Sequence, residues 1–186
     1  MTLQNRNYIS EQKKRYLRNT LLWTIVVVAA FFSGLIIFKT RESYFTVFSG
    51  VMVIGVALNF SRYIGFSKFK DGKEEYADLL ESIKGNYKLF HSVIIPDNRG
   101  TAFFEHLMIT SKGLYFLGYQ DQVIRTCRLW LENKLASKGI PLEQMHFITL
   151  ENTAHLKDII LEIEKDNGYL DERLEEYSKV INDLLM

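Results

Sequence analysis

The chain has 186 residues and a formal net charge of +1, with 47% hydrophobic and 24% charged residues. This length suits one modest domain plus a smaller additional part. The single cysteine, Cys127, excludes an intrachain disulfide, so the composition does not require an oxidising compartment.

Basic and acidic residues are distributed unevenly along the chain. Residues 1–62 contain eight basic and two acidic residues, whereas the other 15 basic and 20 acidic residues follow Arg62. The chain is therefore a basic, apolar head attached to an acidic tail. An acidic tail argues against nucleic-acid binding, which needs a clustered basic surface.

The head contains two uncharged apolar runs, at residues 19–38 and 43–61, separated by the sequence KTRE. Each run is long enough, as a helix, to cross a hydrocarbon core about 30 Å thick. Together they predict a transmembrane helical hairpin over residues 19–64. Neither run contains an ionisable residue, which favours an anchor over an ion pathway.

Two small residues, Ala30 and Gly34, lie four apart on the first run. Such a pair lets helices approach closely. It predicts tight packing within the hairpin or, alternatively, a contact between copies of the chain.

Positive charges flank the outer ends of the predicted hairpin. Four lie just before the first run, at the end of the basic N-terminal segment (residues 1–18), and several follow the second run, whereas the connecting loop contributes only Lys39 and Arg41. By the positive-inside rule, this predicts a multi-pass protein of the inner (cytoplasmic) membrane, with both termini and the soluble domain in the cytoplasm. The flanking residues are Lys13, Lys14, Arg15 and Arg18 before the hairpin, and Arg62, Lys68, Lys70 and Lys73 after it.

A linker over residues 65–72 leads to a predicted α/β domain over residues 73–186. Three apolar runs with short turns between them predict an antiparallel meander, and an amphipathic stretch after them predicts a crossover helix. The order is α-βββ-α-β with two C-terminal helices. The expected elements are a helix at 73–85, strands at 87–96, 101–110 and 114–119, a helix at 123–138, a strand at 143–150, a helix at 155–165 capped by Asn152, and a last helix at 172–186.

The last helix carries a narrow apolar seam. Its residues are spaced four, three, four and three apart, as in a coiled coil. The seam predicts packing on the domain itself or, alternatively, pairing with another subunit. Its members are Leu170, Leu174, Tyr177, Ile181 and Leu184.

Three short motifs between residues 73 and 150 resemble those of the nuclease-related domain family, a branch of the restriction-endonuclease-like fold often found in bacterial membrane-associated proteins. They are Gly72-Lys73-Glu74-Glu75, Phe104-Glu105-His106-Leu107-Met108-Ile109 and Gly113-Leu114-Tyr115-Phe116-Leu117. The resemblance implies that Glu105 takes the place of a metal-binding aspartate, with Glu74 or Glu75 as helpers. Carboxylates around Mg²⁺ would activate water for phosphodiester hydrolysis.

The chain departs from this family at the catalytic positions. Gly118 and Gln120 stand where the family has the glutamate and lysine of a Glu-x-Lys motif. One carboxylate holds Mg²⁺ weakly, although a bulge that turns Asp121 inward would supply a second. The pattern indicates the frame of a nuclease without its catalysis.

Histidine and cysteine provide no strong metal signal. His91, His106 and His146 fall on predicted strands, but no short ligand spacing joins them. His106 follows Glu105 directly and is expected to point to the opposite face of the sheet. We therefore expect no metal site and no cofactor, and we expect Cys127 to be a core residue.

The sequence thus predicts a membrane-anchored, non-catalytic binding or assembly module. Its expected partners are the lipid bilayer and a protein, or a second copy of the chain through the C-terminal helix or the hairpin. The alternatives are a membrane-tethered, Mg²⁺-dependent nuclease that uses Glu105, and a small integral subunit of a larger membrane complex.

Overall fold

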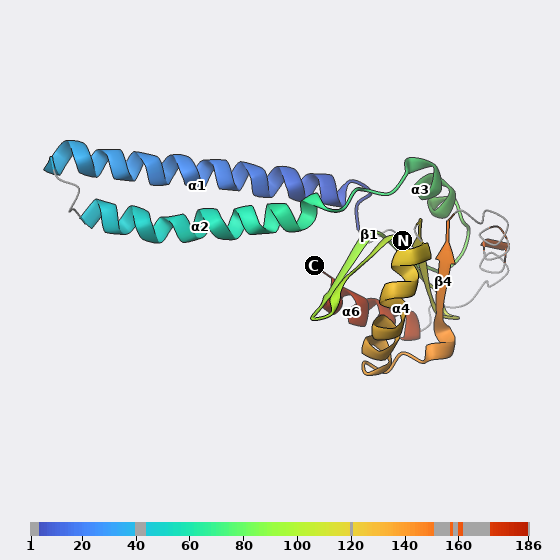
Figure 1. The fold of residues 1–186 in the computed structure, drawn as a ribbon. Helices are drawn as coiled ribbons and strands as arrows, with labels where there is room; N and C mark the ends of the chain where they lie inside the picture. Colours follow the sequence, from blue (N-terminus) through green and yellow to red (C-terminus); the bar gives the residue numbers. More distant parts are fainter. Residues whose placement is uncertain are drawn as a thin grey trace. The chain divides into compact units, whose positions relative to one another are not determined.

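The structure is a computed structural model that describes residues 4–39, 44–119, 121–150, 157, 160–161 and 172–185. The chain forms two compact units (Figure 1). One consists of residues 9–70, and the other combines residues 1–8 with residues 71–186. We call the first the hairpin unit and the second the sheet unit.

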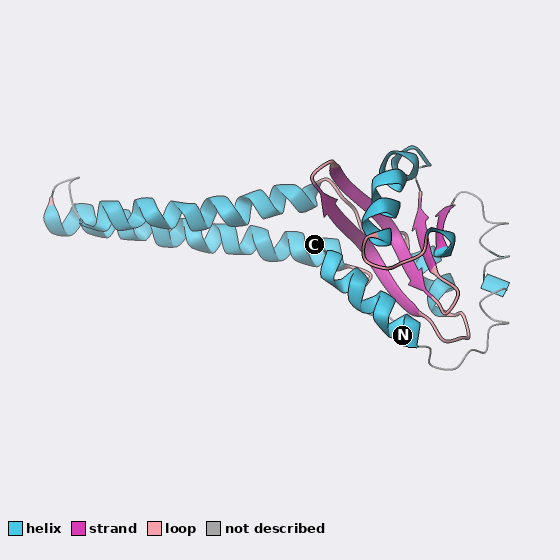
Figure 2. Ribbon diagram, turned by 90° about the horizontal axis from the view of Figure 1, so that it is seen from below, coloured by secondary structure: helices cyan, strands magenta, loops and turns pink. Residues whose placement is uncertain are grey.

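The hairpin unit consists of α1 (Tyr8–Phe38) and α2 (Tyr44–Ser67), which lie side by side along their length (Figure 1, Figure 2). Aromatic contacts mark both ends. The rings of Tyr16 and Phe66 stack at 5.7 Å, and those of Phe38 and Phe45 lie 6.0 Å apart. The helices therefore pack as an antiparallel pair.

Both helices are long and apolar enough to cross a membrane, and only 6% of the most apolar 18-residue window of each is buried. A core helix of a soluble protein would be mostly buried, so this exposure suggests membrane association. On the side of α1 that is covered, Gly34 is buried and Ala30 is half-buried. Their burial agrees with close packing inside the hairpin.

The helices extend beyond the predicted hairpin at both outer ends. α1 begins at Tyr8, so Lys13, Lys14, Arg15 and Arg18 lie on the helix rather than in a separate N-terminal segment. α2 continues to Ser67, into the predicted linker, and Arg62 lies on it over the ring of Tyr16. Hydropathy alone marks the apolar part of a helix, whereas Lys, Arg, Leu and Gln also favour helix outside it.

The sheet unit contains a four-stranded sheet in the order β1-β2-β3-β4. The first three strands are antiparallel neighbours, and β4 runs parallel to β3. The predicted order α-βββ-α-β is confirmed. The elements are α3 (Glu74–Glu81), β1 (Lys88–Asp97), β2 (Gly100–Ile109), β3 (Leu114–Gly118), α4 (Asp121–Ala136), the 3-10 helix η1 (Leu142–Gln144), β4 (Met145–Thr149) and α6 (Glu172–Leu184). The predicted cap Asn152, most of the helix at 155–165 and Leu170 lie outside the described residues.

Apolar clusters cover both faces of the sheet. The larger joins Phe104 and Phe116 to α4 and α6, and the smaller joins Met108 and Leu117 to Leu80 of α3. Cys127 belongs to the larger cluster, as expected. The seam of α6 packs there too, so the domain itself covers Leu174, Tyr177 and Ile181.

The regular alternation of side chains breaks down in the middle of β1 and β2. Phe104 and Leu107 belong to the same cluster although residues three apart on a strand normally face opposite sides. Phe90 and Val93 on β1 do likewise, and Ser92 between them has a left-handed φ of 56°. We call residues 91–92 and 105–106 the strand kink.

The side chains of Glu105 and His106 diverge, as the sequence predicts. The carboxylate of Glu105 lies beside position 118, next to Ile124 of the larger cluster, whereas His106 reaches Glu81 of α3 through His91. A Cβ atom placed on Gly72 would lie 3.3 Å from Cβ of Glu105 and 3.1 Å from Cε1 of His106, so this linker glycine lies close to the base of one side chain and to the ring of the other.

Candidate functional site

Glu105 lies half-buried at the strand kink of β2. Its Oε2 accepts a hydrogen bond from the backbone N–H of Tyr119, at 3.0 Å. Burial raises the pKa of this carboxyl group, and the hydrogen bond from Tyr119 opposes the shift. The carboxyl group of Glu105 is thus fixed by a hydrogen bond, and it takes up a proton more readily than a solvated carboxyl group does.

Gly118 occupies the place where a second carboxylate would meet Glu105. A Cβ on Gly118 would lie 3.6 Å from Oε2 of Glu105, so position 118 faces the carboxylate. The same Cβ would lie 3.1 Å from Cδ1 of Ile124, so that side chain occupies the adjoining space. The strands bring the two positions together, but only one carries a metal ligand.

The other acidic candidates lie on the helix before the sheet. Glu74 and Glu75 lie exposed in the first turn of α3. Glu75 is near enough to Tyr119 that its charge helps to raise the pKa of that hydroxyl, after the larger effects of burial, Tyr76 and Glu105. Gln120 lies outside the described residues.

Asp121 does not supply the missing carboxylate. It begins α4, and its carboxylate pairs with Arg125 at 2.7 Å. Across the part of the chain that the structure describes, no three His, Cys, Asp or Glu side chains gather so that they could hold a metal ion. Mg²⁺ prefers several oxygen ligands, so the described residues do not fit it.

The basic residues of α4 also pair with acidic residues of the same helix. Arg125 pairs with Asp121, and Arg128 pairs with Glu132 at 2.7 Å, each four residues along the helix. All four side chains are at least partly exposed. Such pairs four residues apart are typical of a solvated helix face.

A chain of hydrogen-bonded polar side chains lies beside Glu105, and we call it the histidine cluster. Its two histidines are buried, whereas Arg6, Asp78 and Glu81 are partly or largely exposed. Nδ1 of His91 and Nδ1 of His106 are 2.8 Å apart, and Nε2 of His91 is 3.0 Å from Oε1 of Glu81. Nε of Arg6 donates to the same Oε1 at 2.8 Å. The cluster consists of Arg6, Asp78, Glu81, His91 and His106, with Arg6 also bonded to Asp78 at 2.6 Å.

The hydrogen-bond partners assign the tautomers of both rings. Glu81 is ionised, because the hydrogen bond from Arg6 lowers the pKa of its carboxyl group. A carboxylate only accepts, so His91 donates from Nε2 and its Nδ1 is an acceptor. His106 must then donate from Nδ1, which leaves its Nε2 as a bare acceptor. That atom is buried and has no hydrogen-bond partner within the described residues.

Burial keeps both histidines neutral. It lowers the pKa of His91, and it lowers the pKa of His106 to about 3, helped by the neighbouring His91. Sequence reasoning placed these two residues on neighbouring strands but missed Arg6 and Glu81. His146 does not join them, because its ring stacks on Tyr115 at 4.7 Å.

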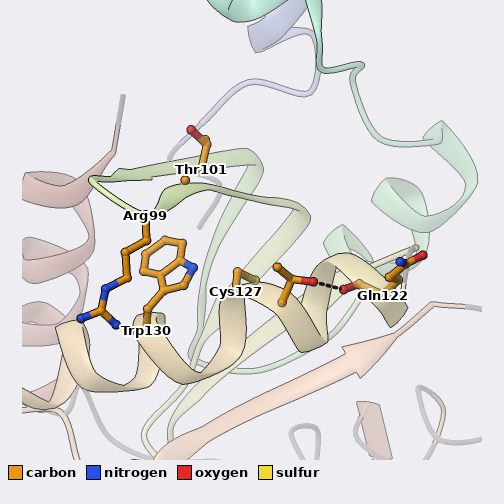
Figure 3. Close-up of a pocket in the computed structure, with 7 residues that line it drawn as sticks. Arg99, Thr101, Gln122, Cys127 and Trp130 are labelled. Carbon is orange, nitrogen blue, oxygen red and sulfur yellow. Dashed lines mark hydrogen bonds between the residues drawn. The ribbon is translucent and has the colours of Figure 1, made fainter.

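A separate pocket of about 310 Å³ lies between the β1–β2 turn and α4 (Figure 3). Trp130 and Cys127 of α4 lie between Arg99 and Gln122 (Figure 3). Burial raises the pKa of the Cys127 thiol to about 11, so it stays protonated at neutral pH. Among the described residues, no side chain pairs with the Arg99 guanidinium or the Gln122 amide.

Sequence reasoning missed this pocket because it joins a turn to a helix more than twenty residues later. Neither segment carries a motif that points to the other.

We compared the chain with protein-family models, curated proteins and solved structures, and none of them matches it.

Proposed function

We propose that this protein is a membrane-anchored, non-catalytic binding or assembly module that retains a nuclease-like frame. The observation that carries the proposal is Gly118 facing Oε2 of Glu105, where a second carboxylate would stand. The order α-βββ-α-β supports a restriction-endonuclease-like fold for the domain. Hydrolysis of a phosphodiester by such a frame needs more carboxylates than Glu105 alone.

The hairpin unit is the anchor in this proposal. Its exposed apolar side chains face lipid, and the flanking positive charges keep both termini and the domain on the cytoplasmic side of the inner membrane. α1 and α2 contain no charged residue in their apolar stretches, so the hairpin carries no proton or ion pathway of its own.

The binding surface that we propose is the pocket beside Arg99. It combines an apolar floor at Trp130 with two polar groups, on Arg99 and Gln122, that have no partner side chain among the described residues. A guanidinium favours carboxylates, so the partner would present an acidic side chain next to an apolar one. The partner is a protein segment, from another protein or from a second copy of the chain.

A photo-crosslinking amino acid at Gln122, in the full-length protein in its native membrane, tests this surface. We expect an adduct at Gln122 that disappears with Arg99→Glu, and none with the probe at Leu142, which is 55% exposed outside the pocket. Differently tagged copies show whether the adduct is a dimer. Equal adducts at both positions, or no effect of Arg99→Glu, would contradict the proposal.

The same experiment separates the third hypothesis, a small integral subunit of a membrane complex. A probe at Ile36, which is 75% exposed on α1, reports contacts of the hairpin. Adducts at Ile36 together with none at Gln122 would favour that hypothesis over the pocket.

A membrane-tethered, Mg²⁺-dependent nuclease is the second candidate function. The half-buried carboxyl group of Glu105, with Glu75 near Tyr119, is the observation in its favour. Full-length protein in lipid nanodiscs, given labelled DNA with Mg²⁺ or Mn²⁺, should leave the DNA intact. Cleavage that disappears in Glu105→Gln but persists in Glu143→Gln, a change at an exposed residue of η1, would establish the nuclease instead.

A further inference from the structure

The polar first turns of α1 carry four basic residues, which differ in what they contact. Nζ of Lys13 donates to the carbonyl oxygen of Phe69 at 2.5 Å. Lys14, Arg15 and Arg18 are exposed, and no side chain pairs with them among the described residues. One of the four cations is therefore used within the hairpin unit, and three are available to a ligand.

A groove lies on one face of α1, and we call it the α1 groove. It has a volume of about 350 Å³ and is lined by Lys14, Leu17, Arg18, Leu21 and Leu22. These positions recur three and four residues apart, so they share one face of the helix. The two cations lie toward the start of α1, and the last two leucines lie in its apolar stretch. The groove thus has a charged end and an apolar end.

The charges at the groove are not balanced by the helix itself. Lys14 and Arg18 are four residues apart, a spacing at which like charges repel. Glu11 is the one acidic residue of α1, and it does not line the groove. A ligand with a phosphate group would offset the repulsion, because the ammonium and the guanidinium both donate hydrogen bonds to phosphate oxygens.

The leucines distinguish a lipid from a free anion. The side chains of Leu17, Leu21 and Leu22 are 44%, 58% and 55% exposed. A free phosphate held by the two cations would leave these leucines uncovered, whereas an acyl chain would cover them. The phosphate of a membrane lipid lies where the polar headgroups meet the hydrocarbon core, which matches the order of cations and leucines along α1.

The positive charge at the groove indicates the class of headgroup. A zwitterionic phospholipid carries its own ammonium group, which balances its phosphate and would be repelled by Lys14 and Arg18. A headgroup without a cation leaves the phosphate charge for the two basic side chains to neutralise. Charge complementarity therefore favours an anionic phospholipid.

We propose that the α1 groove binds one anionic phospholipid, with its phosphate between Lys14 and Arg18 and an acyl chain along the three leucines. This inference rests on the membrane insertion of α1 in the function proposed above. The bound lipid fixes the depth and the rotation of α1 at the surface of the leaflet, because cations anchored at the interface set both for a membrane helix.

Native mass spectrometry of the full-length protein, released from nanodiscs of phosphatidylcholine and phosphatidylglycerol, tests this site. We expect one phosphatidylglycerol to stay bound in preference to phosphatidylcholine. Lys14→Gln/Arg18→Gln should lower this preference about 30-fold, because each Lys or Arg at an anionic lipid surface contributes about fivefold. An unchanged preference in this double variant would overturn the proposal.

The matched control is Arg15→Gln/Lys68→Gln. It removes the same charge from exposed residues at the same end of the hairpin unit, and neither residue lines the groove. At about 0.15 M salt the screening length is about 8 Å, so charges that do not touch the lipid contribute little. The control should keep its lipid. An equal loss in both double variants would mean diffuse attraction to the membrane surface and would contradict a site.

A photoactivatable phosphatidylglycerol with a diazirine in one acyl chain separates a lipid from a free anion. Its adducts should map to Leu21 or Leu22 and disappear in Lys14→Gln/Arg18→Gln, and excess inorganic phosphate should not reduce them. Loss of the adducts on addition of inorganic phosphate would mean that the cations bind a free anion, which would also overturn the proposal.

Insertion is measured separately, by the resistance of the protein in phosphatidylcholine vesicles to alkaline extraction. The wild type and both double variants should resist extraction equally. Extraction of the wild type would contradict the anchor of the proposed function, and the lipid site with it. Insertion without any lipid preference would overturn the lipid site alone.

Discussion

Glycine is required at two positions by how closely other atoms approach. A Cβ on Gly113 would lie 2.2 Å from the carbonyl oxygen of Gln144, which belongs to the backbone and cannot turn aside. A Cβ on Gly72 would meet the ring of His106 at 3.1 Å, and that ring is buried and hydrogen-bonded. Both contacts are closer than ordinary van der Waals distances.

Alanine at these glycines should destabilise the sheet unit in a defined order. Gly72→Ala should lower the free energy of unfolding by about 1–3 kcal/mol, as overpacking does. Gly113→Ala should cost more, because β3 and η1 must separate. Denaturation followed by Trp130 fluorescence in a Trp23→Phe background would measure both. Equal effects would mean that Gln144 yields as easily as a side chain.

The buried histidines make stability depend on pH. The folded-state pKa of His106, about 3, lies below its unfolded value of about 6.5, so the unfolded chain binds more protons between these values. The contribution is complete above about pH 6.5 and is lost as the pH falls. Glu105, whose pKa is raised, acts in the opposite direction, since its contribution is lost as the pH rises.

We therefore expect the free energy of unfolding to fall between pH 6.5 and 5, by at most about 1.4 kcal/mol per pH unit for one proton. His106→Asn should flatten this slope, whereas Glu105→Gln should steepen it. Denaturant titrations of the full-length protein at several pH values measure the slope. An unchanged slope in both variants would assign the acid sensitivity to other groups.

At the residue scale, a sequence motif predicts only those neighbouring residues that regular strand pairing brings together. The resemblance placed Glu105 and Gly118 at two positions where the family has carboxylates, and β2–β3 pairing does bring them together. The histidine cluster escaped prediction because Arg6 and Glu81 are 75 residues apart. The kink escaped it because Ser92, unlike glycine, does not signal a positive φ.

At the element scale, the apolar seam of α6 was predicted either to pack on its own domain or to pair with another subunit, and the structure shows it packed on the domain. Ile181 is fully buried in the larger cluster, whereas Glu176 on the same helix is exposed. Ile181→Ala should therefore lower the free energy of unfolding by about 2–5 kcal/mol, and Glu176→Ala by less than about 0.5 kcal/mol. Denaturant titration measures both. A small loss for Ile181→Ala would mean that α6 packs weakly on its own sheet.

The order of elements could be predicted because each leaves a local periodic pattern of apolar residues. Ile124, Cys127, Leu131 and Leu135 of α4 are all buried, as their helical spacing indicated. Element ends were less predictable. α1 begins at Tyr8 because residues with good helix propensity precede its apolar stretch, and hydropathy does not register them.

At the scale of the whole molecule, the orientation in the membrane can be tested with cysteine labelling. Cys127 is buried and its thiol pKa is raised to about 11, so it gives little background with maleimides. We expect Lys39→Cys to react with an impermeant maleimide in intact spheroplasts, and Leu142→Cys to react only after permeabilisation. The reverse pattern would invert the proposed topology.

The pairing of Arg6 with Glu81 has a consequence for how the chain is made. These residues are 75 positions apart, and the intervening sequence contains both apolar helices. If α1 and α2 both cross the bilayer, as proposed above, the ion pair closes only after the chain has returned to the side of the bilayer from which it left. A chain that inserts α1 alone, or α2 alone, would leave the two charges on opposite sides. In the proposed topology, the pair therefore forms only after an even number of membrane crossings.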